Sequence, residues 1–353
     1  MSRLRAGVVG LGTMGRHHAR LLGSMAGVEL VGAVDPDPLA QAAAPGVPVS
    51  TDLDKLLEAG VDMCVVASPT LTHSTIGLQL AEAGVHTLVE KPLAADPAGG
   101  HRLAKEFGQR GLVGCVGHVE RYNSAARALR ARLAQGELGT VFQVATRRQG
   151  PFPPRIRDVG VIMDLATHDI DLTQWATDSG YLRVAAFTSC PSGRLHEDMV
   201  IVSGMLRDGI VTNHLVNWVS AVKERVFTVT GERGCLMAST LGTELWFQRN
   251  GSATGRRRPG THPFRGASEG DLTRYLITKR EALLVELENF RDAILGKRSE
   301  IVTMRQGAET LEVAAAIQAA SDAAVSSIGI ATGELMLPRQ LDHELAGSPG
   351  VIS

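Results

Sequence analysis

The fold of the first third of the chain is decided by Ala6-Gly7-Val8-Val9-Gly10-Leu11-Gly12-Thr13-Met14-Gly15. Its first four residues predict a buried strand, and the spacing of apolar side chains predicts a helix over residues 15–25. Gly10 permits a tight turn, Gly12 lets the backbone approach a pyrophosphate, and Gly15 allows close packing of helix on strand. Amides at the start of the helix then face the anion. This unit therefore predicts a dinucleotide-binding domain.

Short apolar strands alternate with helical patterns from this turn up to residue 117. Further strands are expected at residues 29–34, 63–67, 87–90 and 112–116. Strands that are apolar throughout and separated by helices indicate a parallel sheet covered on both faces. We therefore predict an α/β fold with a doubly wound Rossmann domain over residues 1–120.

The pattern changes after about residue 120. Residues 161–176 predict a helix, whereas residues 181–247 predict several strands joined by short turns. Two long helices are expected near 280–295 and 304–327. Residues 121–335 are therefore predicted to form an α+β domain with a largely antiparallel open sheet, and residues 336–353 a poorly ordered tail.

The bulk composition excludes several classes of protein. The chain has 353 residues, 44% hydrophobic and 21% charged, and a formal net charge of -1. Such a charge attracts neither nucleic acid nor an anionic membrane surface. There is no apolar run of about 18 residues and no signal-peptide pattern at the start. Four scattered cysteines fit neither a zinc site nor a disulfide framework, so we expect a cytoplasmic protein without a metal.

Asp35 stands 20 residues after Gly15, at the end of the second expected strand. An acidic side chain there accepts hydrogen bonds from the adenosine ribose diol and repels a 2′-phosphate. The residues that follow, Pro36, Asp37 and Pro38, include no cation. The sequence therefore predicts NAD rather than NADP.

Two more loops follow strands of the predicted parallel sheet, so we expect them at the edge formed by the carboxyl ends of its strands. Ser68-Pro69-Thr70 follows a strand and could contact the nicotinamide ribose, while His73 fits a hydrogen bond at a helix start better than a ligand contact. Glu90-Lys91-Pro92 ends the strand at 87–90, where ligands of parallel sheets bind. Lys91 could hold a substrate hydroxyl and stabilise developing negative charge. Taken alone, it is as easily a surface charge.

Asp164 and His168 are four residues apart on one predicted helix, so their side chains share a face, which Asp171 continues. A carboxylate beside an imidazole orients it and raises its basicity. His168 therefore suits removal of a hydroxyl proton as hydride leaves. From spacing alone, a surface His–Asp pair is the commoner explanation.

Taken together, these motifs resemble the Gfo/Idh/MocA family of nicotinamide-dependent sugar and inositol dehydrogenases, over about residues 4–330. The resemblance implies Lys91, Asp164 and His168 as catalytic residues, with His168 as the acid/base. It also implies a homo-oligomer, dimer or tetramer, built by contacts of the second domain's sheet face. The implied NAD contacts are Gly10, Gly12, Thr13, Met14, Gly15, Asp35, Ser68, Pro69, Thr70, His73, Glu90 and Lys91.

Residues 117–123 and 160–171, with Asn217-Trp218 and residues 230–234, look like the branch that oxidises the 3-hydroxyl of UDP-N-acetylglucosamine or related sugars. Nearby cations, including Arg225, could pair with a phosphate or diphosphate, although each is as easily a solvated surface charge. The substrate contacts that this implies are Arg121, Tyr122, Asn123, Arg155, Asp164, His168 and Lys223.

Three other functions remain open from the sequence. One is an inositol or free-sugar dehydrogenase of the same family. Another is a non-catalytic, dinucleotide-sensing regulator, which would be expected to lack the base or the lysine. A third is a structural oligomer component without a ligand, against which the complete glycine turn and Asp35 argue.

Overall fold

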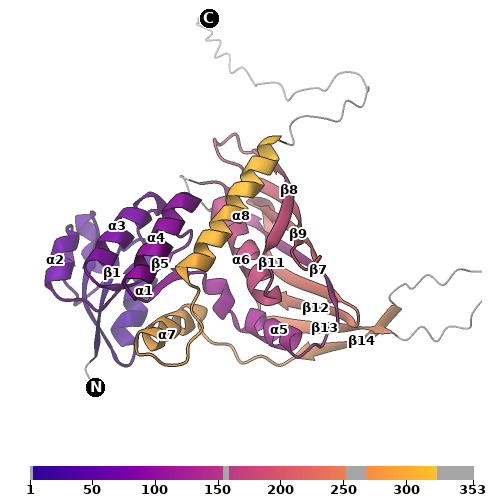
Figure 1. Cartoon of the computed structure of the whole chain (residues 1–353), viewed down its shortest axis with the longest axis horizontal. Helices are drawn as coiled ribbons and strands as arrows, with labels where there is room; N and C mark the ends of the chain where they lie inside the picture. Colours follow the sequence, from indigo (N-terminus) through magenta and orange to yellow (C-terminus); the bar gives the residue numbers. More distant parts are fainter. Residues whose placement is uncertain (1–2, 154–158, 252–267, 324–353) are drawn as a thin grey trace, which may run out of the picture.

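The computed structural model describes residues 3–153, 159–251 and 268–323. Figure 1 shows a compact N-terminal layered domain beside a broad second sheet, with the helix α8 (Met304–Ala323) running between them. None of the helices among the described residues is both long and apolar enough to cross a bilayer.

The first domain is a six-stranded parallel sheet in the order β3-β2-β1-β4-β5-β6. This order confirms the predicted doubly wound fold. The strand order reverses between β1 and β4, so the crevice for a ligand lies at the carboxyl ends of these strands. The strands are β1 Leu4–Val9, β2 Val28–Val34, β3 Val49–Ser50, β4 Met63–Val66, β5 His86–Glu90 and β6 Gly114–Gly117.

Helices cover both faces of this sheet. Aspartates cap α2 and α4, because the side chains of Asp52 and Asp96 accept hydrogen bonds from the amides of Asp54 and Gly99, and Asp37 caps η1 in the same way. The first helix begins at Thr13, two residues earlier than predicted, so its amino end lies within the glycine turn itself. The helical elements are α1 Thr13–Ser24, η1 Pro38–Ala43, α2 Leu53–Glu58, α3 Thr70–Glu82, α4 Pro97–Gln109 and η2 Val119–Tyr122.

The second domain is an eight-stranded sheet in the order β14-β13-β12-β11-β7-β10-β9-β8. Every neighbouring pair is antiparallel except β7 and β10, which confirms the largely antiparallel sheet. Its strands are β7 Val141–Pro151, β8 Tyr181–Ser189, β9 Met199–Leu206, β10 Val211–Asn217, β11 Val219–Gly231, β12 Gly234–Ser239, β13 Glu244–Gly251 and β14 Ser268–Tyr275.

One face of the second sheet is covered by α5 (Ser124–Ala134) and by the helical segment of residues 162–177. Leu129 and Leu172 of these helices pack on Val144 and Phe227 of the sheet. The helical segment opens with one π-helical stretch, η3 (Ile162–Ala166), and continues as α6 (Thr167–Thr177). Such π-bulges occur frequently at functional sites.

The last two helices tie the domains together. Leu287 and Phe290 of α7 (Ala282–Ile294) pack with Val8 in the core of the Rossmann sheet. On α8, Leu311 joins the Rossmann core and Ile317 the core beneath the second sheet. The predicted boundaries, 1–120 and 121–335, place both helices in the second domain, whereas α7 packs in the core of the first domain and α8 packs in the cores of both. The predicted tail, 336–353, lies outside the described residues.

Candidate active site

The glycine turn has the shape that a pyrophosphate site requires. Gly10 has φ +87°, and a Cβ there would lie 2.6 Å from the Ser68 amide nitrogen. A Cβ on Gly15 would lie 1.7 Å from the Gly10 carbonyl oxygen, whereas one on Gly12 would meet nothing within 4 Å. Only glycine therefore fits the two packed positions. Gly12 and the exposed Thr13 leave the amino end of α1 open to a phosphate.

Asp35 lies beside this turn, just past the end of β2. Its Oδ2 accepts a hydrogen bond from the Leu11 amide at 2.6 Å, and its Oδ1 accepts one from the Asp37 amide at 2.9 Å. Each carboxylate oxygen can accept a second hydrogen bond. Since Asp35 is only half-buried, a ribose diol fits here.

His73 joins two loops at the carboxyl edge of the sheet. Its Nδ1 lies 2.9 Å from the Pro92 carbonyl oxygen and its Nε2 lies 2.9 Å from the Ser68 carbonyl oxygen. The ring is 1% exposed, and burial lowers its pKa. His73 therefore positions the Ser68-Pro69-Thr70 loop against the segment that follows β5, and it is too buried to touch NAD directly.

Glu90 is a second buried residue that holds the backbone at the carboxyl end of β5. Its Oε1 lies 2.8 Å from Nε2 of the fully buried His18, and its Oε2 accepts a hydrogen bond from the Lys91 amide at 3.1 Å. Because Glu90 is buried, this pair anchors the end of β5 instead of presenting a carboxylate to the cofactor.

Lys91 and Asp164 meet although 73 residues separate them. The Lys91 Nζ donates hydrogen bonds to Oδ1 and to the carbonyl oxygen of Asp164, at 2.8 and 2.6 Å. Asp164 belongs to η3, and His168 lies one turn further, in the first turn of α6. The Lys91 charge also depresses the pKa of His168, so all three side chains belong to one cluster.

His168 is poised as a neutral base. Burial is the largest cause that holds its pKa well below the usual value, followed by the positive charges of Lys91 and Arg148. Its Nδ1 and the Oδ2 of Asp164 are buried and have no hydrogen-bond partner within the described residues. Buried polar atoms are normally paired, so these two unpartnered atoms favour a polar ligand at this cluster.

The expectation that Asp164 raises the basicity of His168 is wrong. Its carboxylate pairs with Lys91 instead, and the net effect of the surroundings on the imidazole is a lowered pKa. The physical reason is that burial, followed by the charges of Lys91 and Arg148, outweighs the carboxylate, which is paired with the Lys91 ammonium.

A buried ion network that the sequence did not reveal lies beside this cluster. Arg148 of β7 donates to Asp169 at 3.0 Å and to Glu120 at 2.9 Å, and Arg225 of β11 donates to Glu120 at 3.0 Å. Burial raises the pKa of Glu120, but the charges of Arg148 and Arg225 outweigh this effect and hold the pKa below its ordinary value. Glu120 and Asp169 fall inside motifs singled out above, but nothing in the sequence marked Arg148.

The polar groups of three predicted substrate contacts are used inside the protein. Arg121 forms a two-point pair with Asp171, at 2.8 and 2.6 Å. The Tyr122 hydroxyl donates to the Glu300 carbonyl, and Asn123 caps α5. These residues position helices. The neighbour in the sequence that faces His168 is His118, whose ring lies edge-on to the imidazole at 6.4 Å between centroids.

The remaining predicted substrate contacts are dispersed. Lys223 is exposed on β11, and no hydrogen bond or ion pair of its ammonium occurs among the described residues. Arg155 lies outside the described residues. Arg225, on the same strand as Lys223, is, with Arg148, a cation that the fold brings to the site.

Comparison with known proteins identifies this arrangement. A model of the oxidoreductase family with an NAD-binding Rossmann fold matches residues 4–118, and the GFO/IDH/MocA C-terminal domain matches residues 126–237. The chain belongs to the GFO/IDH/MocA oxidoreductase family. The resemblance inferred from the motifs is thus confirmed, and the chain is an NAD-dependent oxidoreductase.

Individual family members extend the similarity over nearly the whole chain. UDP-N-acetylglucosamine 3-dehydrogenase of Acidithiobacillus ferrooxidans is 30% identical over 336 residues, 92% of this chain and 99% of that protein. Its solved structure has a TM-score of 0.80 at 28% identity, covering 93% of this chain and 100% of that one. A protein of gentamicin A biosynthesis, solved with NAD, has a TM-score of 0.76 at 25% identity, covering 91% and 95%. Inositol 2-dehydrogenase 4 of Saccharopolyspora erythraea is 33% identical over 220 residues, 58% of this chain and 65% of that protein.

A buried carboxyl group under the site gives a prediction about pH. Glu286 of α7 is 1% exposed, and neither of its carboxyl oxygens has a partner within the described residues. Burial, then the charges of Glu90 and Asp171, raise its pKa well above the usual value. A raised pKa in the folded state contributes stability that is full below the unfolded value, about 4.3, and is lost as pH rises through the folded value.

Glu286→Gln should therefore change the pH dependence of stability. We expect the melting temperature of the native chain to fall, relative to that of the variant, as pH rises from 6 to 9, because only the native side chain must ionise. Calorimetric melting at several pH values measures this difference. Glu288→Gln, on the same helix but partly exposed and paired with Arg280, is the control. A constant difference across that range would show that Glu286 does not titrate there.

Proposed function

We propose that this family member oxidises a secondary hydroxyl, favoured at C3, of a nucleotide-linked or phosphorylated hexose such as UDP-N-acetylglucosamine. This proposal rests on the cluster of Lys91, Asp164 and His168. In it the Lys91 ammonium is paired with Asp164 and acts on the neutral imidazole of His168. The 3-dehydrogenase that matches 92% of the chain supports this choice of substrate.

NAD supplies the hydride acceptor when it is bound. We propose that the glycine turn and the amino end of α1, from Gly10 to Gly15, hold its pyrophosphate and that Asp35 holds the adenosine ribose. The loop Ser68-Pro69-Thr70 would border the nicotinamide ribose. His73 and Glu90 would act through the backbone segments that they anchor.

The proposed roles in the reaction follow from charge. The Lys91 ammonium donates a hydrogen bond to the substrate oxygen and stabilises negative charge as it develops there. The neutral His168 takes the hydroxyl proton, so the alcohol carbon loses a hydride, the oxygen loses a proton, and a carbonyl results. Asp164 keeps the ammonium in place through two hydrogen bonds.

The test is a screen of substrates with NAD. UDP-N-acetylglucosamine, other UDP-sugars, hexose phosphates, free hexoses and inositols are compared by the absorbance of the reduced cofactor. Analysis of the product then locates the carbonyl. Turnover of UDP-sugars with a ketone at C3 supports the proposal.

A second candidate is an inositol or free-sugar dehydrogenase, which the similarity to inositol 2-dehydrogenases favours. It predicts turnover of inositols or free hexoses and none of UDP-sugars. A regulator that only senses the dinucleotide predicts NADH binding without turnover of any sugar.

Asp35 gives a prediction about cofactor choice. Asp35→Ser with Pro36→Arg removes the acidic ribose acceptor and adds a partner for a 2′-phosphate. The ratio of kcat/KM with NAD to kcat/KM with NADP should fall at least about tenfold, equivalent to about 1.4 kcal/mol. Asp37→Ser, which removes a neighbouring exposed carboxylate, is the control. Equal or better activity of the native enzyme with NADP would refute the predicted preference.

We also propose that the chain forms a cytoplasmic homo-oligomer, a dimer or tetramer, through the outer face of its second sheet. Large apolar side chains on four adjacent strands point away from the core and are 41–66% exposed, namely Phe142, Phe187, Ile201 and Val211. Contiguous exposed apolar surface of this kind marks interaction sites.

The oligomeric state can be measured directly. Sedimentation velocity should show a dimer or tetramer, and Phe187→Lys with Ile201→Lys, which pair across β8 and β9, should shift it to monomer. Leu39→Lys with Leu71→Lys, at exposed apolar positions of the first domain, should leave it assembled. A monomeric native chain would contradict the proposal.

A further inference from the structure

A cavity lies away from the Lys91–His168 cluster. It has a volume of about 560 Å³ and is bordered by α4, the carboxyl end of α6, the start of β8 and α8. Neither Lys91, Asp164 nor His168 lines it. The lining residue Asp178 is ten positions beyond His168, about 15 Å along a helix axis. The cavity is therefore separate from the proposed substrate site, and its size suits a small organic ligand.

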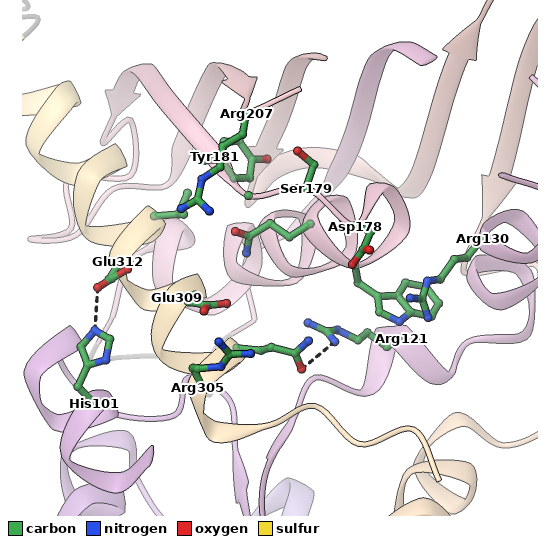
Figure 2. Close-up of a pocket in the computed structure, with 15 residues that line it drawn as sticks. His101, Arg121, Arg130, Asp178, Ser179, Tyr181, Arg207, Arg305, Glu309 and Glu312 are labelled. Atoms are coloured by element: carbon green, nitrogen blue, oxygen red, sulfur yellow. Dashed lines mark hydrogen bonds and ion pairs between the residues drawn. The ribbon is translucent and has the colours of Figure 1, made fainter. Parts of the chain in front are cut away.

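The floor of this cavity is built from hydrogen-bond donors. Arg121 is 6% exposed, and its Nε and Nη2 are taken by Asp171. Its Nη1 makes one long bond of 3.4 Å, to Oε1 of Gln306, which Figure 2 shows as a dashed line. A guanidinium carries five N–H groups, so two of them have no partner among the described residues. The Nε2 of Gln306 likewise makes no hydrogen bond there.

Three further arginines line the cavity: Arg207 and Arg305 on opposite walls, and Arg130, whose guanidinium lies 4.6 Å from the centroid of the Trp175 ring. Arg207 follows β9 and Arg305 lies in the first turn of α8, with the cavity between them (Figure 2). Within the part of the chain that the structure describes, neither guanidinium donates a hydrogen bond or forms an ion pair. On the same cavity Nε2 of His101 and Oε1 of Glu312 lie 2.7 Å apart. Arg207 and Arg305 therefore face the cavity with guanidinium groups that have no partner among the described residues, above a floor of donors.

The other lining groups accept hydrogen bonds. Asp178 and Glu309 have no ion pair among the described residues, and Ser179 lies beside Asp178. Such acceptors recognise hydroxyl groups. Arginine forks match the oxygens of a phosphate. A ligand that combines a dianionic phosphate with several hydroxyls satisfies both sets.

We propose that this cavity binds a phosphomonoester of a polyol, such as a hexose phosphate. Arg207 and Arg305 pair with the phosphate from two sides, and Arg121 and Gln306 donate to its remaining oxygens. Asp178 and Glu309 accept hydrogen bonds from the hydroxyls. The site is additional to the proposed reaction centre and does not depend on what is oxidised there.

Calorimetric titration of the full chain with D-glucose 6-phosphate, in the absence of NAD, tests the proposal. We expect saturable binding that weakens at least about tenfold in Arg207→Ala with Arg305→Ala. Arg183→Ala with Arg298→Ala removes the same charge from exposed positions outside the cavity and should leave affinity within about twofold. D-glucose and D-glucuronate are titrated in parallel to separate the polyol and carboxylate contributions.

One further variant distinguishes the two sites. Lys91→Met alters the proposed reaction centre, so it should weaken any binding of D-glucose 6-phosphate there and leave the affinity of the cavity for this ligand unchanged. Loss of binding in Lys91→Met but not in the double arginine variant would place the ligand at the reaction centre and overturn the proposal. Absence of saturable binding, equal affinity of native and double-variant chains, or equal affinity for glucuronate and the phosphate would overturn it too.

Discussion

Replacing His168 with alanine should lower kcat by about 10²–10⁴-fold, because the variant has no group to take the hydroxyl proton. The structure supports this expectation through the buried surroundings and neighbouring cations that keep the imidazole neutral. The affinity for NADH, measured by fluorescence titration, should change little, since none of the proposed pyrophosphate or adenosine contacts includes His168.

The pH profile gives this prediction a second readout. The acid limb of kcat/KM reports the pKa of the base in the free enzyme. Since the pKa of His168 lies well below 6.5, activity of the native enzyme should persist below pH 6.5 and fall only as the imidazole gains its proton at lower pH. His168→Ala should lack this limb. The control is His101→Ala, at an exposed histidine paired with Glu312. Near-native turnover of His168→Ala would refute the assigned role.

Replacing Lys91 with methionine should reduce both turnover and stability. Loss of one donor to a developing oxyanion typically costs about 10²–10³-fold in kcat. The Lys91 and Asp164 side chains are only 14% and 7% exposed, so the variant also leaves Asp164 buried without its partner. Removing one member of a buried pair costs about 3–5 kcal/mol, which should appear as a lower melting temperature.

A double variant separates these two effects. Asp164→Asn in the Lys91→Met background removes the orphaned charge, so it should recover much of the melting temperature but none of the turnover. Steady-state kinetics and calorimetry on the same samples measure both quantities. If the double variant recovered turnover together with stability, Lys91 would be a structural residue and the reaction scheme would need another oxyanion donor.

Arg121 illustrates where a motif misleads. It stands in the run Arg121-Tyr122-Asn123, where a phosphate contact was expected. Its partner Asp171 is 50 residues away, and Arg121 lines the cavity beside α8, which Lys91 does not line. A charged residue next to a functional motif can thus serve to join two helical segments, and only the burial of its guanidinium reveals this.

The sequence by itself determined the Rossmann half, the dinucleotide turn and the edge at which the site forms. These features are local: Gly10 and Gly15 meet across five residues, and Asp35 and Lys91 follow directly from strand ends. The period of apolar residues fixes which segments are strands, and parallel strands bring their carboxyl ends together.

Only the tertiary structure decided how the charges pair. It joined Asp164 to Lys91 and Arg148 to Glu120 and Asp169, contacts that span 21 to 73 residues. It also placed α7 in the core of the first domain. A local pattern carries no signal for such pairs, because a buried charge selects its partner by the packing of elements that lie far apart along the chain.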